Sequence, residues 1–377
     1  MKLKLIKVGL TIFLIFTFLC CSPQKTEWQG TIEEVDGITV VKNPKEPIYG
    51  EDICIIEEEL SIGQAEGSKE YMFSGIREVV VDVKENIYVA DNKEMEIKVY
   101  DKFGRYLRTV GEEGQGPGEI GSLNGIQIVN DSKLMIHDEK NRRLHYFSLN
   151  GKFLGAKKFG TLWHLDLLSD SDKIYYSVVS IKDPPNSRIE LLRLDSELNK
   201  IETIGTMHMS DSPLSLKFFI PEIEFKIMHN SCLLYGYPEN DYELKIFNRE
   251  GKLLKRIIKK FDPVPVSDKD KQKVMKSFKN MAQGIQVSDR MFKFESHHPA
   301  YSKFVTDDRG WIFVRTWKIP NDEEGVIYDV FDEEGRFLAE LELDFIPIVW
   351  NKDRIYTIEE DEEGYQYVKR YKVTWNY

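Results

Sequence analysis

Cysteine is scarce in this sequence, with four residues in a chain of 377. Cys20 and Cys21 stand near the N-terminus, whereas Cys54 and Cys232 lie further along the chain. Small secreted proteins that depend on a disulfide framework carry many more cysteines for their length. The sequence therefore excludes a disulfide scaffold, and we expect Cys54 and Cys232 to be unpaired thiols.

Positive charge is also in deficit. The chain has 52 Lys and Arg against 63 Asp and Glu, which gives a net charge of −11 at pH 7. Such a surface repels a nucleic-acid backbone, so a nucleic-acid partner is disfavoured. Aromatic residues make up 12% of the chain, which favours β-structure. With 41% apolar residues, the composition is that of a folded globular protein.

The apolar run near the N-terminus, residues 8–19, is too short to span a bilayer, which takes a helix of about 20 apolar residues. It follows a basic start made by Lys2, Lys4 and Lys7. A basic start followed by an apolar segment of this length is typical of a secretory signal peptide. We therefore expect the protein to be exported.

The end of this run, Leu19-Cys20-Cys21-Ser22, resembles the lipobox of bacterial lipoproteins. The resemblance implies acylation of Cys21, which follows the small Cys20, with Cys20 as the alternative. It also implies a signal peptide over residues 1–20, a polar tether over residues 21–48 and a membrane-anchored protein of the bacterial cell envelope. Two or more acyl chains anchor a protein stably. The membrane leaflet stays open, and an ordinary cleaved signal with release of the protein is the alternative.

An eight-residue pattern recurs through the rest of the chain: an aromatic residue, Asp, Ser or Asn, two free positions, Gly, a basic residue, an apolar residue and Leu. The copies are YDKFGRYL at residues 100–107, FSLNGKFL at 147–154, FNREGKLL at 247–254, FDEEGRFL at 331–338 and a degenerate LDSELNKI at 194–201. The Gly accepts positive φ and the polar residue can bond to the turn backbone. Each copy therefore predicts a β-hairpin.

A short apolar segment precedes each copy and recurs once more near the C-terminus. The six segments begin at Ile87, Leu134, Ile174, Leu233, Ile312 and Ile355. A repeat of about 40–50 residues is the length of a four-stranded propeller blade. The sequence therefore predicts an all-β fold, a six-bladed β-propeller of four-stranded antiparallel blades over residues 49–377.

Residues 75–120 look like an NHL-type repeat, and residues 297–315 resemble the same family. The resemblance weakens but extends over nearly the whole chain, and it is especially close to six-bladed propeller lipoproteins of bacterial cell envelopes. The third and fourth units depart from the pattern, because Val178 and Tyr237 stand where the first unit has Asp91.

The sixth unit has no Gly hairpin of its own, since only residues 365–374 remain after its central strand. We expect the N-terminal segment 52–62, with its alternating apolar residues, to supply the missing outer strand. Pairing both ends of the chain leaves no free sheet edge around the ring.

The blade order places the connections from second to third strands, and those between blades, on one face. The long ones are residues 111–124, 181–188, 205–221, 259–299 and 317–325. Binding residues concentrate on long loops held by a rigid scaffold, so we assign function to this face. The insertion at about 260–299 is predicted to contain a helix that begins at Ser267 with a capping box, carries Val274, Phe278 and Met281 on one stripe and ends near Gly284. Its lysines indicate either a partner contact or a solvated face.

Motifs for known chemistries are absent or misplaced. Residues 116–121 match GxGxxG, but the following segment reads as a strand and not as the helix that a dinucleotide site requires. The chain has neither a GxSxG nucleophile elbow nor an HExxH helix. No cofactor is therefore expected on this basis.

A metal site is the alternative interpretation. Propeller lyases hold a metal with histidines from several blades, and resemblance to them would assign His137, His164 and His298 as ligands of Zn²⁺. Resemblance to gluconolactonase-like propellers would instead assign Glu359, Asp91 and Asp138 to Ca²⁺ or another divalent cation. A structural role for each side chain is the competing explanation.

The ligand-binding candidates are Arg142, Trp163, Arg315 and Trp317, because Arg and aromatic residues are enriched at binding hot spots and these lie on or near the proposed face. We expect a monomeric binding module without catalysis, whose partner is a small molecule, a peptide or an envelope protein. The alternative is a metal-dependent lyase or lactonase-like hydrolase at the central channel.

Overall fold

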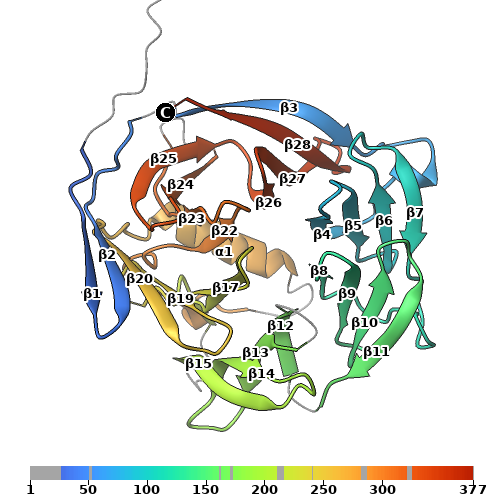
Figure 1. Ribbon diagram of the computed structural model, residues 1–377, viewed down its shortest axis with the longest axis horizontal. Helices are drawn as coiled ribbons and strands as arrows, with labels where there is room; N and C mark the ends of the chain where they lie inside the picture. The colour runs from blue at the N-terminus through green and yellow to red at the C-terminus, as the bar shows by residue number, and fades with distance from the viewer. Residues whose placement is uncertain are drawn as a thin grey trace, which may run out of the picture.

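The computed structural model describes residues 27–50, 53–160, 163–169, 173–209, 216–239, 241–281, 287–320 and 325–376, and the side chains of residues 163–167 lie outside this description. Within it, the chain forms six blade-like sheets around a ring (Figure 1). The expected six-bladed propeller is therefore confirmed.

Each blade has four antiparallel strands in sequence order from the inside outward, except that the last blade takes its outer strand from the N-terminus. The first two blades are β4 (Ile76–Val81), β5 (Ile87–Asp91), β6 (Glu96–Tyr100) and β7 (Tyr106–Val110), then β8 (Gly125–Val129), β9 (Lys133–Asp138), β10 (Arg143–Ser148) and β11 (Phe153–Lys158). The third and fourth are β12 (Trp163–Ser169), β13 (Tyr175–Ile181), β14 (Arg188–Leu194) and β15 (Lys200–His208), then β17 (Glu224–Ile227), β18 (Leu233–Gly236), β19 (Glu243–Phe247) and β20 (Leu253–Lys259). The fifth and sixth are β22 (Lys303–Thr306), β23 (Ile312–Arg315), β24 (Val326–Phe331) and β25 (Phe337–Leu343), then β26 (Pro347–Asn351), β27 (Arg354–Glu360), β28 (Gln366–Trp375) and β3 (Cys54–Ile62).

The six recurring apolar segments form the second strand of each blade. Every residue of β5 and of β18 is buried. Blades stack face to face around the ring, so a strand in the middle of a blade needs apolar side chains on both sides. This explains why these segments are continuously apolar instead of alternating.

The eight-residue pattern forms the turn between the third and fourth strands, as predicted. Its glycines have positive φ, namely 77° at Gly104, 90° at Gly151, 83° at Gly251 and 89° at Gly335. Leu198 takes this position at 64° in the degenerate copy. In the first copy Asp101 Oδ1 accepts hydrogen bonds from the amides of Phe103 (2.9 Å) and Arg105 (3.0 Å).

The ring closes through the two ends of the chain, as expected. β3 pairs antiparallel with β28, and the register runs from Ile62 opposite Val368 to Cys54 opposite Trp375. Figure 1 shows β3 and β28 side by side along the outside of the sixth blade. The sixth blade therefore depends on residues more than 300 positions apart in the sequence.

The assignment of residues 21–48 to a tether is wrong for much of that segment. β1 (Thr31–Val35) and β2 (Ile38–Asn43) form a hairpin, and β2 adds in parallel to β20, so the fourth blade becomes a six-stranded sheet. β2 joins this sheet because the pairing buries Val40 and Val41. These two side chains are 3% and 0% exposed, although Thr39 and Lys42 beside them are polar. The propeller therefore begins before residue 49.

The segment after this hairpin continues around the outside of the ring. Asn43 Nδ2 donates to the carbonyl of Gly335 (2.8 Å), and its Oδ1 accepts from the amide of Phe337 (2.8 Å). The amides of Ile48 and Tyr49 then bond to the carbonyls of the fifth blade's outer strand, at 3.2 and 2.8 Å. Residues 31–50 and 53–62, which we call the N-terminal belt, thus join the fourth, fifth and sixth blades.

The insertion between the fourth and fifth blades contains α1 (Asp268–Met281), the 3₁₀ turn η2 (Asp289–Met291) and β21 (Phe292–Phe294), which pairs in parallel with β16 (Leu216–Phe218). The predicted capping box is confirmed, because Asp270 accepts from the amide of Ser267 (2.9 Å) and Ser267 Oγ accepts from that of Asp270 (3.1 Å). The predicted apolar stripe is wrong at its end, since Met281 is 74% exposed. Gly284 lies outside the described residues.

Neither Cys54 nor Cys232 forms a disulfide in the part of the chain that the structure describes, as expected. Within the described residues, no helix has both the length and the apolar character needed to cross a membrane.

Candidate functional site

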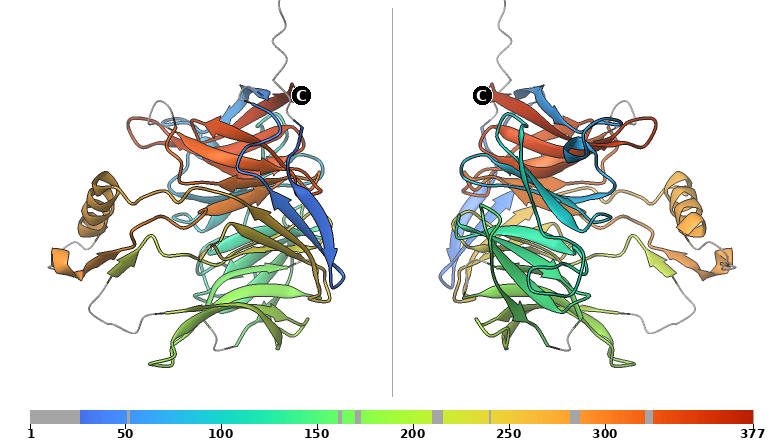
Figure 2. Two further views of the ribbon diagram at one scale, coloured as in Figure 1. Left: turned by 90° about the vertical axis from the view of Figure 1, so that its left-hand side faces the viewer. Right: turned by 90° about the vertical axis from the view of Figure 1, so that its right-hand side faces the viewer.

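The insertion marks one face of the ring as different from the other. Figure 2 shows α1, β16 and β21 standing off this face. The antiparallel order places the connections between blades on the same face as the insertion, and the Gly turns on the opposite face. We call the side that carries the insertion the loop-rich face.

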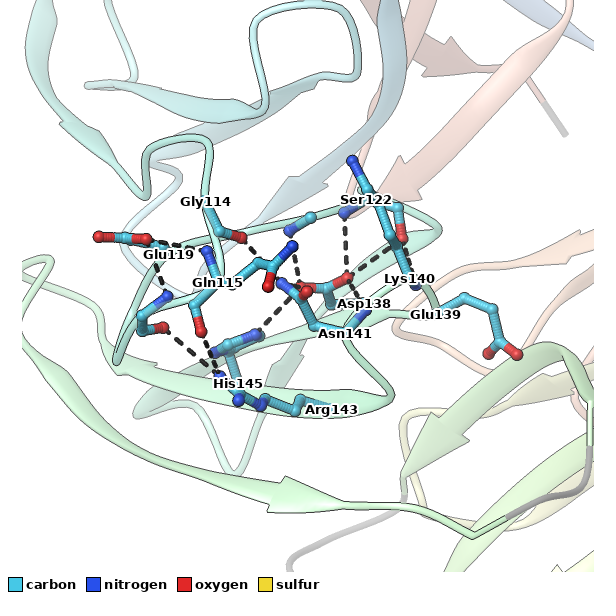
Figure 3. A network of polar contacts seen from close by, with 12 residues as sticks. Gly114, Gln115, Glu119, Ser122, Asp138, Glu139, Lys140, Asn141, Arg143 and His145 are labelled. Atoms are coloured by element: carbon cyan, nitrogen blue, oxygen red, sulfur yellow. Dashed lines mark hydrogen bonds and ion pairs between the residues drawn. The ribbon is translucent and has the colours of Figure 1, made fainter.

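Asp138, the last residue of β9, fixes the connection between the first and second blades (Figure 3). Its carboxylate is fully buried and accepts hydrogen bonds from the amides of Gly121 (2.8 Å), Ser122 (3.0 Å) and Asn141 (3.0 Å), with His145 Nε2 at 3.2 Å. Burial raises the pKa of Asp138, but the hydrogen bonds from His145, Gly121 and Asn141 outweigh it and lower the pKa to about 2. The carboxylate is therefore ionised and occupied by protein donors.

Asp91 makes the same kind of attachment in the first blade. Its carboxylate accepts from the amide of Ser74 (2.7 Å), in the connection that enters the blade, and from the amide of Lys93 (3.1 Å). In both blades a carboxylate at the end of the second strand thus holds the incoming connection against the ring.

The third and fourth blades have no carboxylate at this position, because Val178 and Tyr237 stand there. The connection into the fourth blade carries β16 away from the ring and into the insertion. Val178 and Tyr237 both line a cavity of about 640 Å³ between the third and fourth blades and the insertion. The cavity thus lies where the carboxylate attachment is lost.

Most of the cavity wall is apolar. The lining residues are Val178, Ile189, Met207, His208, Met209, Leu216, Lys217, Phe218, Ile220, Pro221, Glu222, Ile223, Tyr237 and Phe278. Ionisable groups are limited to His208, Lys217, Glu222 and the Tyr237 phenol. Burial raises the pKa of Tyr237, and the Glu239 carboxylate adds to this effect, so its hydroxyl is protonated and available as a donor.

Aromatic packing within the insertion forms the outer wall. Phe218 stacks on Phe292 with ring centroids 5.6 Å apart, and Phe278 of α1 meets both rings edge-on at 6.0 and 5.7 Å. Phe294 lies 5.8 Å from Phe218. Such contacts fix ring positions beyond simple area burial, so Phe218 and Phe278 present a defined surface to the cavity.

Trp317 and His298 lie at the base of the insertion and not in the cavity wall. Their rings stack at 4.3 Å, and Phe219 meets His298 edge-on at 4.6 Å. His298 Nε2 lies 3.3 Å from Asp270 Oδ2, which links the start of α1 to the fifth blade. Burial lowers the pKa of His298, although the Asp270 carboxylate opposes this shift.

The four ligand-binding candidates do not form one site in the described part of the chain. Arg142 is exposed in the turn after β9, whereas Arg315 lies in β23, opposite Lys303 and Tyr328. Trp163 and His164 belong to β12, but their side chains lie outside the described residues. Of the candidates whose side chains are described, none of Arg142, Arg315 and Trp317 lines the cavity.

The metal candidates have separate partners. His137 Nε2 lies 3.1 Å from Glu139, and His298 engages Asp270. Glu359 accepts from Thr357 Oγ1 (2.7 Å) and from the Tyr371 hydroxyl (2.8 Å). Among the described side chains, no group of three or more His, Cys, Asp or Glu comes together as metal ligands. These contacts support structural roles for the residues named here.

Sequence reasoning missed the cavity because its wall comes from many separate segments. Two features of the sequence could have indicated it. Val178 and Tyr237 stand where the first unit has an aspartate, and the insertion contains several phenylalanines.

A family of six-bladed β-propellers, DUF5128, matches residues 66–314. The chain belongs to this family. Among curated proteins, none matches the sequence significantly.

Solved structures share the fold of this family member. One is a protein from Bacteroides fragilis described as exported, with a TM-score of 0.54 and 10% identity, covering 89% of this chain and 100% of that chain. Another is a DUF4221 family member from Bacteroides vulgatus, with a TM-score of 0.52 and 11% identity, covering 85% of this chain and 98% of that chain. At such identities the similarity shows the fold alone.

Proposed function

We propose that this protein is a binding module, without catalysis, that takes an apolar ligand in the cavity between the third and fourth blades and the insertion. The ligand is a small molecule or an apolar side chain of a peptide. The observation that carries the proposal is the cavity of about 640 Å³ with its apolar wall.

The shape and chemistry of the cavity suit this function. Ligand pockets commonly measure about 300–1,000 Å³ and combine an apolar lining with a few polar groups. Here the blades supply one wall as part of a rigid ring, and the aromatic packing of the insertion fixes the other. A preformed wall lowers the ordering cost of binding.

The first test is calorimetric titration with n-decanol, a neutral apolar probe. We expect the unsubstituted protein to bind it and Val178→Trp to bind it roughly tenfold more weakly or worse, because overfilling an apolar site costs about 1–3 kcal/mol. Val83→Trp is the matched control, since Val83 is 57% exposed in a turn on the opposite face. Absence of binding, or equal affinity of both variants, would contradict the proposal.

The proposal includes export and lipid anchoring at Cys21, which lies outside the described residues. The support is the basic start, the apolar run and the cysteine that ends it, together with the fold shared with an exported Bacteroides protein. We expect the protein to stay with the membrane fraction in high salt, because acyl chains hold it and not surface charge. Cys21→Ala should move it out of that fraction, whereas Cys54→Ala should not, and retention of the Cys21→Ala variant would refute the anchor.

A further inference from the structure

The folded part of the chain begins very close to the anchoring cysteine of the proposed function. Trp28 Nε1 donates to Asn43 Oδ1 at 3.1 Å, so the chain is attached to the propeller from residue 28 onward. Seven Cα–Cα steps separate Cys21 from Trp28, and a fully extended chain covers at most about 25 Å in that number. An acylated Cys21 would therefore hold the propeller directly against the membrane.

The attachment point lies beside the start of the insertion. Thr31 pairs with Lys42, and Lys42 pairs with Ile258, the residue before the end of β20. Adjacent strands are about 4.8 Å apart, so Thr31 is only about 10 Å from the place where the chain leaves the fourth blade. The amide of Lys260 also bonds to the carbonyl of Asn43 at 3.2 Å. Asn43 also bonds to the carbonyl of Gly335, in a Gly turn of the opposite face, so the belt enters the fold on the outer side of the ring, next to the strand that leads into the insertion.

The insertion carries the opposite charge to the rest of the protein. Residues 268–295 contain seven Lys and Arg against four Asp and Glu, in a chain whose net charge is −11. On α1, Lys269, Lys273 and Lys276 follow the spacing that places side chains on one side of a helix. This lysine stripe lies opposite Val274 and Phe278, the partly buried side of the helix that packs in the insertion.

Two of these cations, Lys273 and Lys276, differ from their neighbours on the helix in their ion pairing. Lys271 pairs with Asp268 (3.0 Å) and Lys279 with Asp289 (2.5 Å). Within the described residues, neither Lys273 nor Lys276 has an ion-pair partner, and both are exposed. They are therefore free to meet an external anion.

We propose that the lysine stripe of α1 contacts anionic phospholipid headgroups of the membrane that anchors the protein, so that the loop-rich face is turned toward the bilayer. This inference rests on the anchoring of the proposed function. A basic residue near an anionic membrane contributes about 1 kcal/mol, which corresponds to roughly fivefold in binding. The negative charge of the remaining surface disfavours other orientations.

The test uses the acylated full chain on vesicles of phosphatidylcholine alone and of phosphatidylcholine with phosphatidylglycerol. Amine-reactive labelling followed by mass spectrometry reports the exposure of individual lysines. We expect Lys273 and Lys276 to be labelled at least about fivefold more slowly on the anionic vesicles, and high salt to remove the difference. Lys152 and Lys252, exposed in the turns of the opposite face, are the matched controls and should not change.

The possible outcomes separate the acyl anchor from the membrane contact of α1. If the protein does not bind neutral vesicles, the acyl anchor is refuted. Protein that binds both vesicle types with equal labelling of Lys273 and Lys276, or with protection of Lys152 and Lys252 instead, refutes the membrane contact alone. Lys273→Glu should weaken the protection of Lys276 on the anionic vesicles while leaving vesicle attachment intact, since the acyl chains remain.

Discussion

Replacing Asp329 with alanine is expected to lower the free energy of unfolding by about 3–5 kcal/mol. Asp329 of β24 faces Lys259 at the end of β20, with Oδ2 and Nζ 3.4 Å apart, and their side chains are 0% and 1% exposed. The Lys259 ammonium also lies over the ring of Phe337, 4.4 Å from its centroid. Removing the carboxylate leaves a buried positive charge at the seam between the fourth and fifth blades.

Urea unfolding should compare the free energy of unfolding of Asp329→Ala with that of two other variants. Lys259→Met combined with Asp329→Leu should recover most of the loss, because replacing both members of a buried pair by apolar side chains is often neutral or stabilising. Glu33→Ala breaks the exposed pair with Lys42 and should cost less than about 1 kcal/mol. A double variant as unstable as the single one, or a loss at Asp329 no larger than that at Glu33, would show that the buried charge is not the cause.

This pair illustrates what the sequence could not show. The repeat pattern located the strands of both blades, yet Lys259 ends the outer strand of one blade and Asp329 lies in the third strand of the next. Contacts across a seam depend on how two blades twist against each other. A period of 40–50 residues contains no such information.

The turns were predictable because their chemistry is local. A tight hairpin needs one residue at positive φ and an acceptor for the turn amides, so Gly104 and Asp101 reveal it from eight residues alone. The degenerate copy shows that the pattern tolerates loss of its glycine, since Leu198 adopts a φ of 64°. Loss of the glycine from a copy of the pattern therefore need not mean loss of the turn.

The first half of the N-terminal belt was not predicted because an edge strand looks like a polar linker. Every residue of β1 is exposed, and Glu33 and Glu34 occupy its centre. Charged residues on an edge prevent further pairing with other chains. The buried apolar residues of β2 are Val40 and Val41, and two such residues are too short a signal to distinguish a strand from a tether.

For the candidate site, the sequence predicted the insertion and its helix on one face of the ring, but the residues that it named are conspicuous polar and tryptophan side chains and not those of the described cavity wall. Asp138 and His298 attach loops to the ring, as their hydrogen bonds show. The apolar residues Val178 and Phe278, which line the cavity, are ordinary in isolation. They become informative only when the fold brings them together.

Removing β3 is expected to abolish cooperative folding of the propeller. Without it, β28 would have an unpaired edge, and the apolar contacts of Ile53, Ile62, Val368 and Val373, each 1–2% exposed, would open to water. Full burial of such side chains contributes about 1.5–3 kcal/mol each. Their sum is comparable with the total stability of a typical domain, about 5–15 kcal/mol. Circular dichroism during thermal unfolding should show a broad, non-cooperative change in a chain that starts at residue 64.

The comparison with a chain that starts at residue 53 separates the two halves of the belt. That chain loses the β1–β2 hairpin and Asn43 but keeps β3, so the ring can still close and the transition should stay cooperative at a lower midpoint. A peptide of residues 53–62 added to the shorter chain should restore the sharp transition, because strand pairing across the ends does not require a covalent connection. If the shorter chain unfolds cooperatively without the peptide, ring closure by β3 is dispensable and the hairpin alone stabilises the outside of the ring.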